Sequence, residues 1–215
     1  NNNVQKPVAL RIYHEMNGSW FWWGTAAELA NKPGGGQYTH SEMYIKLYRH
    51  AVTYVKDRTN YALFVWSPDV AFQPTYARDF GDAAELYYPG DDYVDIVGLD
   101  YYEPTVDYLR NQLGQLTDFA EQHGKVAAVT ELGHRGANAD KDYRDDAPTF
   151  WSGTVLEAIK NDPANKAQRI AWLQTWLHQS WSAYYVPVLD NKNANDQVYQ
   201  DFQSFKNDPD TLFQW

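Results

Sequence analysis

Two glutamates that end apolar, strand-like segments are the residues of this chain best suited to chemistry. Glu15 follows the run Val8–Tyr13, and Glu131 lies near the end of the run Lys125–Gly133. A pair of carboxyl groups can cleave a glycosidic bond, because one donates a proton to the leaving oxygen while the other attacks as a nucleophile or acts as a base. A single glutamate at a strand end is more often a salt-bridge or loop-anchoring residue, so the interpretation depends on the pair.

Aromatic residues crowd the segment that contains Glu15. The stretch RIYHEMNGSWFWWG, Arg11–Gly24, has four aromatic residues in a row soon after Asn17 and Gly18. Aromatic rings stack on the apolar faces of sugars, and rings that exclude water raise the pKa of a neighbouring carboxyl group. Packing into the core is the alternative for each ring. The four residues are Trp20, Phe21, Trp22 and Trp23.

Composition narrows the kind of ligand. Of the 215 residues, 16% are aromatic, and the formal net charge is -10. This charge argues against nucleic acid and against anionic membrane surfaces, since both attract basic proteins. The absence of cysteine excludes disulfides and thiolate chemistry. No apolar run approaches the ~20 residues of a membrane span. A neutral ligand fits these properties best.

Other common reaction centres are not indicated. The histidines show no zinc-ligand spacing and there is no HExxH motif, so no metal is expected. The segment NKPGGGQY has glycines but neither a Walker lysine nor the GxGxxG spacing of a dinucleotide-binding loop. No GxSxG motif is present, which leaves no case for a serine-hydrolase elbow. We therefore predict an activity without metal or other cofactor.

Apolar runs of strand length alternate with helical segments along the chain. The runs are nearly continuous in apolar residues, which is typical of strands buried on both faces in a parallel sheet covered by helices. With no internal repeat or clear linker, we predict a single α/β domain over residues 1–215. The predicted strands are Val8–Tyr13, Tyr61–Pro68, Val94–Tyr102, Lys125–Gly133 and Arg169–Leu177.

Helices are predicted between these strands. The first begins at Ser41, which is a suitable N-cap. Its apolar face is expected to consist of Met43, Leu47, Ala51, Tyr54 and Val55. The other predicted helices are Val106–His123, ended by Gly124, a segment near Pro148–Lys160, and a closing helix within Asp201–Phe213. Asn31–Thr39 is predicted as a loop, and the stretch from Asp79 to Gly90 as irregular.

The carboxyl ends of parallel strands are where chemistry gathers in α/β folds. Here these ends offer polar and aromatic residues beside the two glutamates. In chain order they are His14 with Glu15, Trp66, Asp100 with Tyr101 and Tyr102, Glu131, and Trp176 with His178. Several have structural alternatives, because a lone histidine is usually hydrogen-bonded within a fold and Trp176 could fill the bottom of a barrel.

The segments around these residues resemble glycoside hydrolase family 26, whose best-known members are endo-β-1,4-mannanases. Arg11–Gly24 resembles the acid/base segment of the family. Similar segments follow in family order: FVWSP, DIVGLDYYE, AVTELG, FWSGTVLEAIKND, IAWLQTW, YYVPV and DFQSFKNDPDTLF. The resemblance covers nearly the whole chain. It implies a (β/α)8 TIM barrel, of which this chain supplies roughly strands 4 to 8, and a retaining mechanism.

The resemblance also implies roles for individual residues. Glu15 is similar to the family's acid/base at the end of the fourth strand, and Glu131 to its nucleophile at the end of the seventh. Tyr102, ahead of its neighbour Tyr101, is similar to the tyrosine that hydrogen-bonds the nucleophile. The other implied substrate-binding residues are His14, which precedes the acid/base, Trp20 and Trp23 in the aromatic run, and Trp176, which resembles the floor beneath the attacked sugar.

Two features depart from the family pattern. A barrel of this kind needs roughly 250 residues, and this chain begins at what resembles the fourth strand. The first part of the barrel is therefore expected elsewhere, in the same protein or in another chain. Leu177 stands where many family mannanases have a basic residue, which bears on contacts one sugar beyond the cleavage point and on substrate preference.

The predicted function is endo-acting hydrolysis of β-1,4-mannosidic bonds in galactomannan or glucomannan, by a secreted, periplasmic or cell-surface enzyme. Within the family, β-1,3-1,4-glucanase and β-1,3-xylanase activities are the alternatives. From a different class, a non-catalytic carbohydrate-binding protein would use its tryptophans as a stacking platform. Two intact glutamates favour the enzyme, because a binding protein has no need of both. The tryptophans of such a platform would be Trp20, Trp22, Trp23 and Trp176.

Overall fold

The main sheet is built from parallel strands, as the sequence predicts. The structure is a computed structural model that describes residues 6–25, 29–70, 79–102, 104–134, 148–176, 186 and 197–213. Within these residues the sheet has five strands, all parallel, in the spatial order β1-β4-β5-β6-β7. This order is consistent with part of the wall of a TIM barrel. The strands are β1 Val8–Leu10, β4 Ala62–Trp66, β5 Ile96–Tyr102, β6 Val126–Gly133 and β7 Leu173–Thr175.

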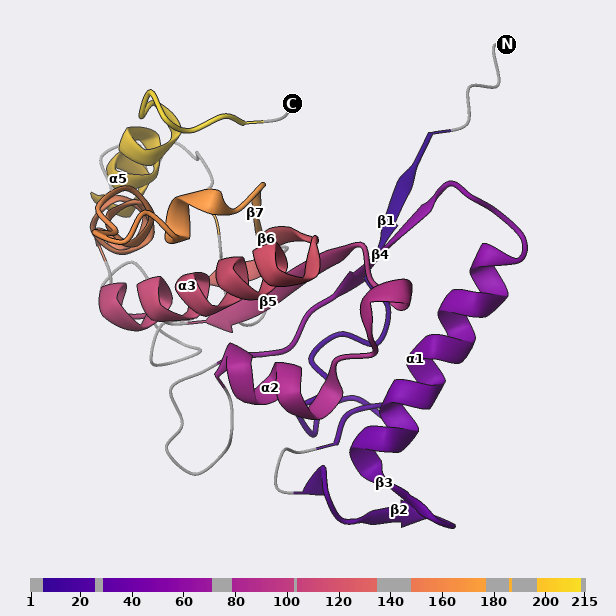
Figure 1. Cartoon of the computed structure of the whole chain (residues 1–215). Helices are drawn as coiled ribbons and strands as arrows, with labels where there is room; N and C mark the ends of the chain where they lie inside the picture. Colours follow the sequence, from indigo (N-terminus) through magenta and orange to yellow (C-terminus); the bar gives the residue numbers. More distant parts are fainter. Residues whose placement is uncertain are drawn as a thin grey trace.

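Helices lie in the connections between successive strands, and α1, α2 and α3 follow one another along the sheet (Figure 1). None of the described helices is long and apolar enough to cross a membrane. A short hairpin of β2 Pro33–Gly35 and β3 Tyr38–Thr39 precedes α1, where a loop was predicted. The longer helices are α1 His40–Lys56, α2 Phe80–Tyr87, α3 Val106–His123 and α5 Gln197–Lys206. The shorter ones are the 3-10 turns η2 Asp91–Tyr93 and η5 Ala167–Arg169, and the π-helical η4 Phe150–Leu156, which continues into α4 Glu157–Lys160.

The two faces of the sheet are buried to different extents. Alternate residues of a strand point to opposite faces. In β4, Phe64 and Trp66 are fully buried in the large cluster that contains the helix residues. Val65 points the other way and packs with Ile96 of β5 and Ala128 of β6 in a separate small cluster. The helix-covered face therefore carries the main core. Trp66, which was predicted at the carboxyl end of a strand, is part of that core.

The small cluster lies on a face that the described residues leave partly open. Leu63 of β4 is 44% exposed and Val126 of β6 is 45% exposed, and each lies two residues before a member of the small cluster. Trp172, directly before β7, is 37% exposed. Its neighbour Leu173 packs against the main core, so Trp172 lies toward the other face. These three large apolar residues form what we call the open face.

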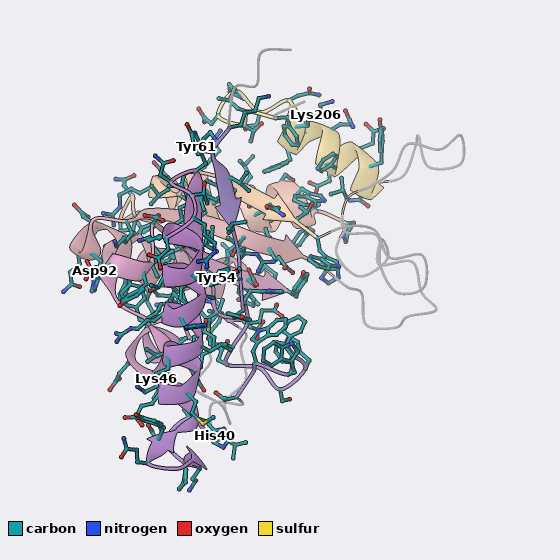
Figure 2. The ribbon with its side chains drawn as sticks, turned by 90° about the vertical axis from the view of Figure 1, so that its right-hand side faces the viewer. His40, Lys46, Tyr54, Tyr61, Asp92 and Lys206 are labelled. Carbon is teal, nitrogen blue, oxygen red and sulfur yellow. The ribbon has the colours of Figure 1, made fainter. Side chains whose placement is uncertain are left out.

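Helix α1 forms where it was predicted, but with a different cap and a different buried face. Thr39, not Ser41, is the N-cap, and it forms a capping box with Glu42. The predicted apolar face is wrong for Met43 and Tyr54, which are 43% and 54% exposed, whereas Val55 packs against the main core. Figure 2 looks onto this helix, with His40, Lys46 and Tyr54 labelled along it. The buried residues are Ser41, Tyr44, Tyr48 and Val52.

The remaining elements follow the predicted order, but several differ in their bounds. β1 ends at Leu10 and not at Tyr13, and α5 begins at Gln197, before the predicted Asp201. α3 covers the predicted residues and ends at Gly124, whose φ of 63° is the left-handed conformation that glycine adopts most easily. α2 replaces the irregular stretch predicted after Asp79. The Asp79 side chain caps this helix by accepting a hydrogen bond from the backbone of Asp82 at 2.8 Å. β7 is shorter than predicted and begins only at Leu173.

Candidate active site

Glu15 and Glu131 both lie at the carboxyl ends of strands and are both buried, being 7% and 3% exposed. Glu131 is part of β6, and Glu15 follows β1 in a segment without regular secondary structure. The negative charge of Glu131 is one of the influences that raise the pKa of Glu15, so the two carboxyl groups lie close enough to interact. The structure therefore brings together the two acids that the sequence singled out.

The backbone holds Glu15 in an unusual conformation. Tyr13 and Glu15 have positive φ values of 50° and 51°, which cost of order 1 kcal/mol or more for residues other than glycine. Two hydrogen bonds fix this conformation. The Glu15 N–H donates to the carbonyl of Ser67 at 2.8 Å, and the Gly18 N–H donates to the carbonyl of Glu15 at 3.0 Å. The turn joins Glu15 to the end of β4. Its side chain interacts with the buried acids Asp100 and Glu131, and we call these three residues the acid cluster.

Trp20 covers the carboxyl group of Glu15. Its indole N–H donates to Glu15 Oε2 at 2.5 Å. Gly18 makes this possible, because a Cβ at that position would lie 2.4 Å from the indole ring of Trp20. Trp20 remains 48% exposed, so part of its surface is available to a ligand.

Burial gives Glu15 the properties of an acid at neutral pH. Desolvation raises its pKa from 4.5 to about 7, with further contributions from the negative charges of Asp69 and Glu131. The hydrogen bond from Trp20 and the positive charge of Arg11 oppose this rise. Near neutral pH a substantial fraction of Glu15 is therefore protonated and able to donate a proton.

Arg11 links the acids on neighbouring strands, and sequence reasoning assigned it no role. Its guanidinium donates to Asp100 Oδ2 at 2.7 Å, to Ser67 Oγ at 3.2 Å and also to Glu131 Oε1. Burial alone would lower the pKa of Arg11, but the carboxylates of Asp100 and Glu131 outweigh it and raise that pKa. Arg11 follows β1 directly, and β6 is the third strand along from β1.

The contact between Arg11 and Glu131 shows that the main sheet is curved. Neighbouring strands lie about 4.8 Å apart, so β1 and β6 would be about 14 Å apart in a flat sheet. Arg11 and Glu131 nevertheless share a hydrogen bond. Their contact requires the sheet to curl so that the two side chains point toward each other from its concave side, which is the geometry of a barrel wall.

Asp100 is the most deeply buried residue of the acid cluster. It is fully buried, and burial raises its pKa well above the ordinary value although Arg11 opposes the rise. The hydroxyl of Thr130 donates to Asp100 Oδ1 at 2.6 Å. Gly98 makes room for this arrangement, because a Cβ there would lie 2.5 Å from the Thr130 side chain and 3.2 Å from the Ser67 side chain.

Tyr102 and His14 complete the surroundings of Glu131. The Tyr102 hydroxyl donates to Glu131 Oε2, whereas the ring of Tyr101 is buried in the main core. His14 Nε2 lies 3.9 Å from Glu131 Oε1. Burial, and secondly the charge of Arg11, lower the pKa of His14 to about 4, so its ring is neutral near pH 7.

The aromatic run packs against His14. Phe21 stacks on Trp23 with ring centroids 4.4 Å apart, and the His14 ring lies 4.8 Å from Phe21. The indole N–H of Trp23 donates to the backbone carbonyl of His14 at 2.8 Å. Trp22 is 77% exposed and meets Trp23 edge to face. Trp23 thus holds the backbone of the segment that carries Glu15, while Trp20 and Trp22 present surface to solvent.

The last sequence candidates follow β7 in the chain. Trp176 is half-buried and directly follows Thr175, which pairs with Leu132, the residue after Glu131. Trp176 therefore lies at the carboxyl end of the strand beside the one that carries Glu131. Leu177 and His178 lie outside the described residues.

One group of possible metal ligands lies within the described residues. Single ligand atoms of His14, Asp100 and Glu131 lie within 4.8 Å of one another. The guanidinium of Arg11 already contacts both carboxylates of this group. A metal cation would have to compete with that fixed positive charge, so the donor set does not suit a metal.

The chain is similar to known glycosyl hydrolases. The family model described as "Glycosyl hydrolase family 26" matches residues 1–184. A mannan endo-1,4-beta-mannosidase of Bacillus subtilis strain 168 is 32% identical over 191 residues, which are 84% of this chain and 46% of that protein.

Solved structures show the same relation. A Cellulomonas fimi endo-beta-1,4-mannanase double mutant has a TM-score of 0.73 and 33% identity, over 96% of this chain and 42% of its own. The catalytic domain of a Bacillus sp. JAMB-750 GH26 endo-beta-1,4-mannanase has a TM-score of 0.72 and 32% identity, over 96% of this chain and 51% of its own. The chain thus spans about half the length of these proteins.

Proposed function

Because the chain belongs to glycosyl hydrolase family 26, we propose that it forms part of a retaining endo-β-1,4-mannanase with Glu15 as acid/base and Glu131 as nucleophile. The observation that carries this proposal is the contrast between the surroundings of the two buried acids. Trp20 covers Glu15, whose pKa is raised to about 7, whereas Glu131 accepts hydrogen bonds from Arg11 and Tyr102. Paired carboxyl groups in unlike environments are suited to divide acid and nucleophile roles.

In the first step, the Glu131 carboxylate attacks the anomeric carbon of the sugar on the non-reducing side of the bond. The bond from that carbon to the bridging oxygen breaks, and Glu15 gives its proton to the departing oxygen. Arg11 and Tyr102 hold the Glu131 carboxylate in place by donating a hydrogen bond to each of its oxygens. The product is a covalent glycosyl-enzyme with its anomeric configuration inverted.

In the second step, Glu15 acts as a base. Its carboxylate takes a proton from water, and the water oxygen attacks the anomeric carbon and displaces Glu131. Two inversions leave the configuration of the released sugar unchanged. The retaining route requires the two carboxyl groups to be about 5–5.5 Å apart when substrate is bound.

Substrate contacts are proposed for residues that border the two acids. Trp20, half exposed beside Glu15, offers a ring for the sugar whose oxygen is protonated. The neutral ring of His14 can hydrogen-bond a sugar hydroxyl without bringing a second positive charge beside Arg11. Trp176 is proposed as the floor beneath the attacked sugar. Trp23 contributes by holding the backbone of His14.

The substrate assignment is tested with polysaccharides that differ in sugar and linkage. We expect the native protein that carries this chain to release manno-oligosaccharides from galactomannan and glucomannan, and much less product from lichenan or β-1,3-xylan. Chromatography of the products gives the measurement. Preferential cleavage of lichenan or β-1,3-xylan would contradict the mannanase assignment. Binding to mannan without hydrolysis would favour the carbohydrate-binding alternative.

We also propose that residues 1–215 are the C-terminal part of one barrel domain, whose five parallel strands are the fourth to the eighth. The curled sheet and the open face support this proposal, since a closed barrel would fill its concave side with the residues of that face. The first part of the barrel, from the same protein or another chain, is the proposed partner of the open face. Because mannans are large polymers, we propose that the enzyme acts outside the cell or in the periplasm.

A charged residue on the open face tests the closed barrel. We expect Leu63→Asp to lower the free energy of unfolding of the native protein by about 2 kcal/mol or more, because a buried carboxylate without a partner is costly. Leu212→Asp is the matched control, since Leu212 is 98% exposed, and its effect should stay within about 0.5 kcal/mol. Denaturant unfolding measures both. Equal effects of the two substitutions would show that Leu63 stays in contact with water and would contradict the closed barrel.

A further inference from the structure

Asp69 is a buried acid near Glu15 to which the mechanism above gives no part. It lies three residues after β4 and is 7% exposed. The backbone around it is joined to Asp100 of β5, since the Asp100 N–H donates to the Pro68 carbonyl at 2.9 Å and the Val70 N–H donates to the Asp100 carbonyl at 2.8 Å. Asp69 is therefore fixed to the part of the sheet that carries the acid cluster.

Asn17 fixes Asp69 from the other side. Its side-chain amide donates to the Asp69 carbonyl at 2.6 Å, and its side-chain oxygen accepts from the Asp69 N–H at 3.0 Å. Asn17 is itself 1% exposed. It belongs to the turn of Glu15, because the Gly18 N–H donates to the Glu15 carbonyl.

The two acids thus belong to one hydrogen-bonded unit. The Glu15 N–H donates to the Ser67 carbonyl at 2.8 Å, and two residues further along each segment Asn17 pairs with the backbone of Asp69. These contacts hold the backbone of Glu15 at a fixed position relative to the backbone of Asp69. The sequence alone does not predict these contacts, because they depend on the segment after β1 lying beside the end of β4.

The charged groups that act on Glu15 come from several elements. Arg11 after β1 favours its ionised form, whereas Asp69 after β4 and Glu131 on β6 favour its protonated form. Asp100 on β5 also interacts with Glu15. Arg11 is hydrogen-bonded to Asp100 and Glu131, so its positive charge is directed to those two acids. After burial, Asp69 has the largest influence on Glu15.

We propose that Asp69 is a positioning residue for the acid/base: Asn17 joins the backbone of Asp69 to the turn that carries Glu15, so that the two buried acids are held side by side at this end of the sheet. This inference rests on the proposed role of Glu15. It adds a reason why Asn17 and Asp69 are buried together at a carboxyl end of the sheet.

The experiment is a titration of Glu15 in the native protein and in Asp69→Asn, which removes the charge and keeps the shape of the side chain. NMR signals of the Glu15 carboxyl carbon and of the Trp20 indole N–H, its hydrogen-bond donor, report the ionisation directly. A negative neighbour raises the pKa of an acid, so its removal should lower the pKa of Glu15 from about 7 by about one pH unit. Asp107→Asn, on an aspartate whose side chain is 95% exposed, is the matched control and should leave the titration unchanged.

A second measurement needs no substitution. In the native protein the Asp69 carboxyl signal should show an inflection at the pKa of Glu15, because coupled acids report each other's titration. An unchanged Glu15 titration in Asp69→Asn, or, where that variant does not fold, the lack of this inflection, would overturn the proposal. Neither titration needs hydrolysis, so both outcomes stand apart from the proposed function. If the enzyme is active, the alkaline limb of kcat/KM should move down in pH with the Glu15 titration, which a purely structural role of Asp69 would not produce.

Discussion

Replacing Glu131 with alanine is expected to lower kcat for mannan hydrolysis by at least about 10⁴-fold, because the covalent intermediate cannot form without the proposed nucleophile. The fold should persist, since the space left by the side chain lies where substrate binds. The Arg11 guanidinium keeps its contact with Asp100 in the variant. Initial rates of reducing-sugar release, together with a thermal unfolding curve, measure activity and folding in the same preparation.

Azide tests whether Glu131 is the nucleophile and not only an essential acid. A small anion that enters the cavity of the alanine variant attacks the anomeric carbon once, so a β-mannoside with a good leaving group should give an α-mannosyl azide. Glu85→Ala is the control, because Glu85 is an exposed glutamate on α2. Activity of Glu131→Ala close to that of Glu85→Ala would remove Glu131 from the mechanism. A β-azide product would assign it the acid/base role instead.

Much of the fold could be predicted because its signals are local. Continuous apolar runs identified the parallel strands, and the glycine at position 124 marked the end of α3. The buried face of α1 could not be predicted in this way. Tyr44 and Tyr48 fill it, and the Tyr44 hydroxyl is satisfied by the Tyr13 carbonyl at 3.1 Å, a contact that depends on tertiary structure. The apolar spacing along the sequence therefore selected a neighbouring face of α1, which contains the exposed Met43 and Tyr54.

The residues of the candidate site also fall into two groups: those indicated by local sequence and those that depend on tertiary structure. The proximity of Glu15 and Glu131 could be predicted, because each follows or ends an apolar run and the carboxyl ends of parallel strands meet. Arg11 and Asp69 could not, since their importance arises from which segments become neighbours when the sheet curls. Arg11 reaches acids on β5 and β6 only across the concave side of the sheet. No spacing along the sequence contains that information.

Glu15 is required in both steps of the proposed mechanism, and the two steps respond differently when it is removed. Glu15→Ala is expected to lower kcat/KM on mannan by about 10²–10⁴-fold, because the departing sugar oxygen needs a proton. An aryl mannoside with a highly acidic leaving group does not need that proton. Its first step should remain fast while the second, which needs Glu15 as base, becomes slow, so the glycosyl-enzyme accumulates. Pre-steady-state release of the aryl group measures this as a burst.

The same variant should respond to azide in the opposite stereochemical sense to Glu131→Ala. Azide requires no base, so it should accelerate breakdown of the accumulated glycosyl-enzyme and give a β-mannosyl azide by a second inversion. In the native protein, the alkaline limb of the pH profile of kcat/KM follows Glu15, whose pKa is about 7. In Glu15→Ala, the profile measured with the aryl substrate should lack this limb. An α-azide from Glu15→Ala, or an alkaline limb that persists, would contradict the acid/base assignment. Opposite azide configurations from the two variants would require two different carboxyl groups on opposite faces of the sugar. That is the arrangement proposed for Glu131, which Arg11 and Tyr102 contact, and for Glu15, which Trp20 contacts.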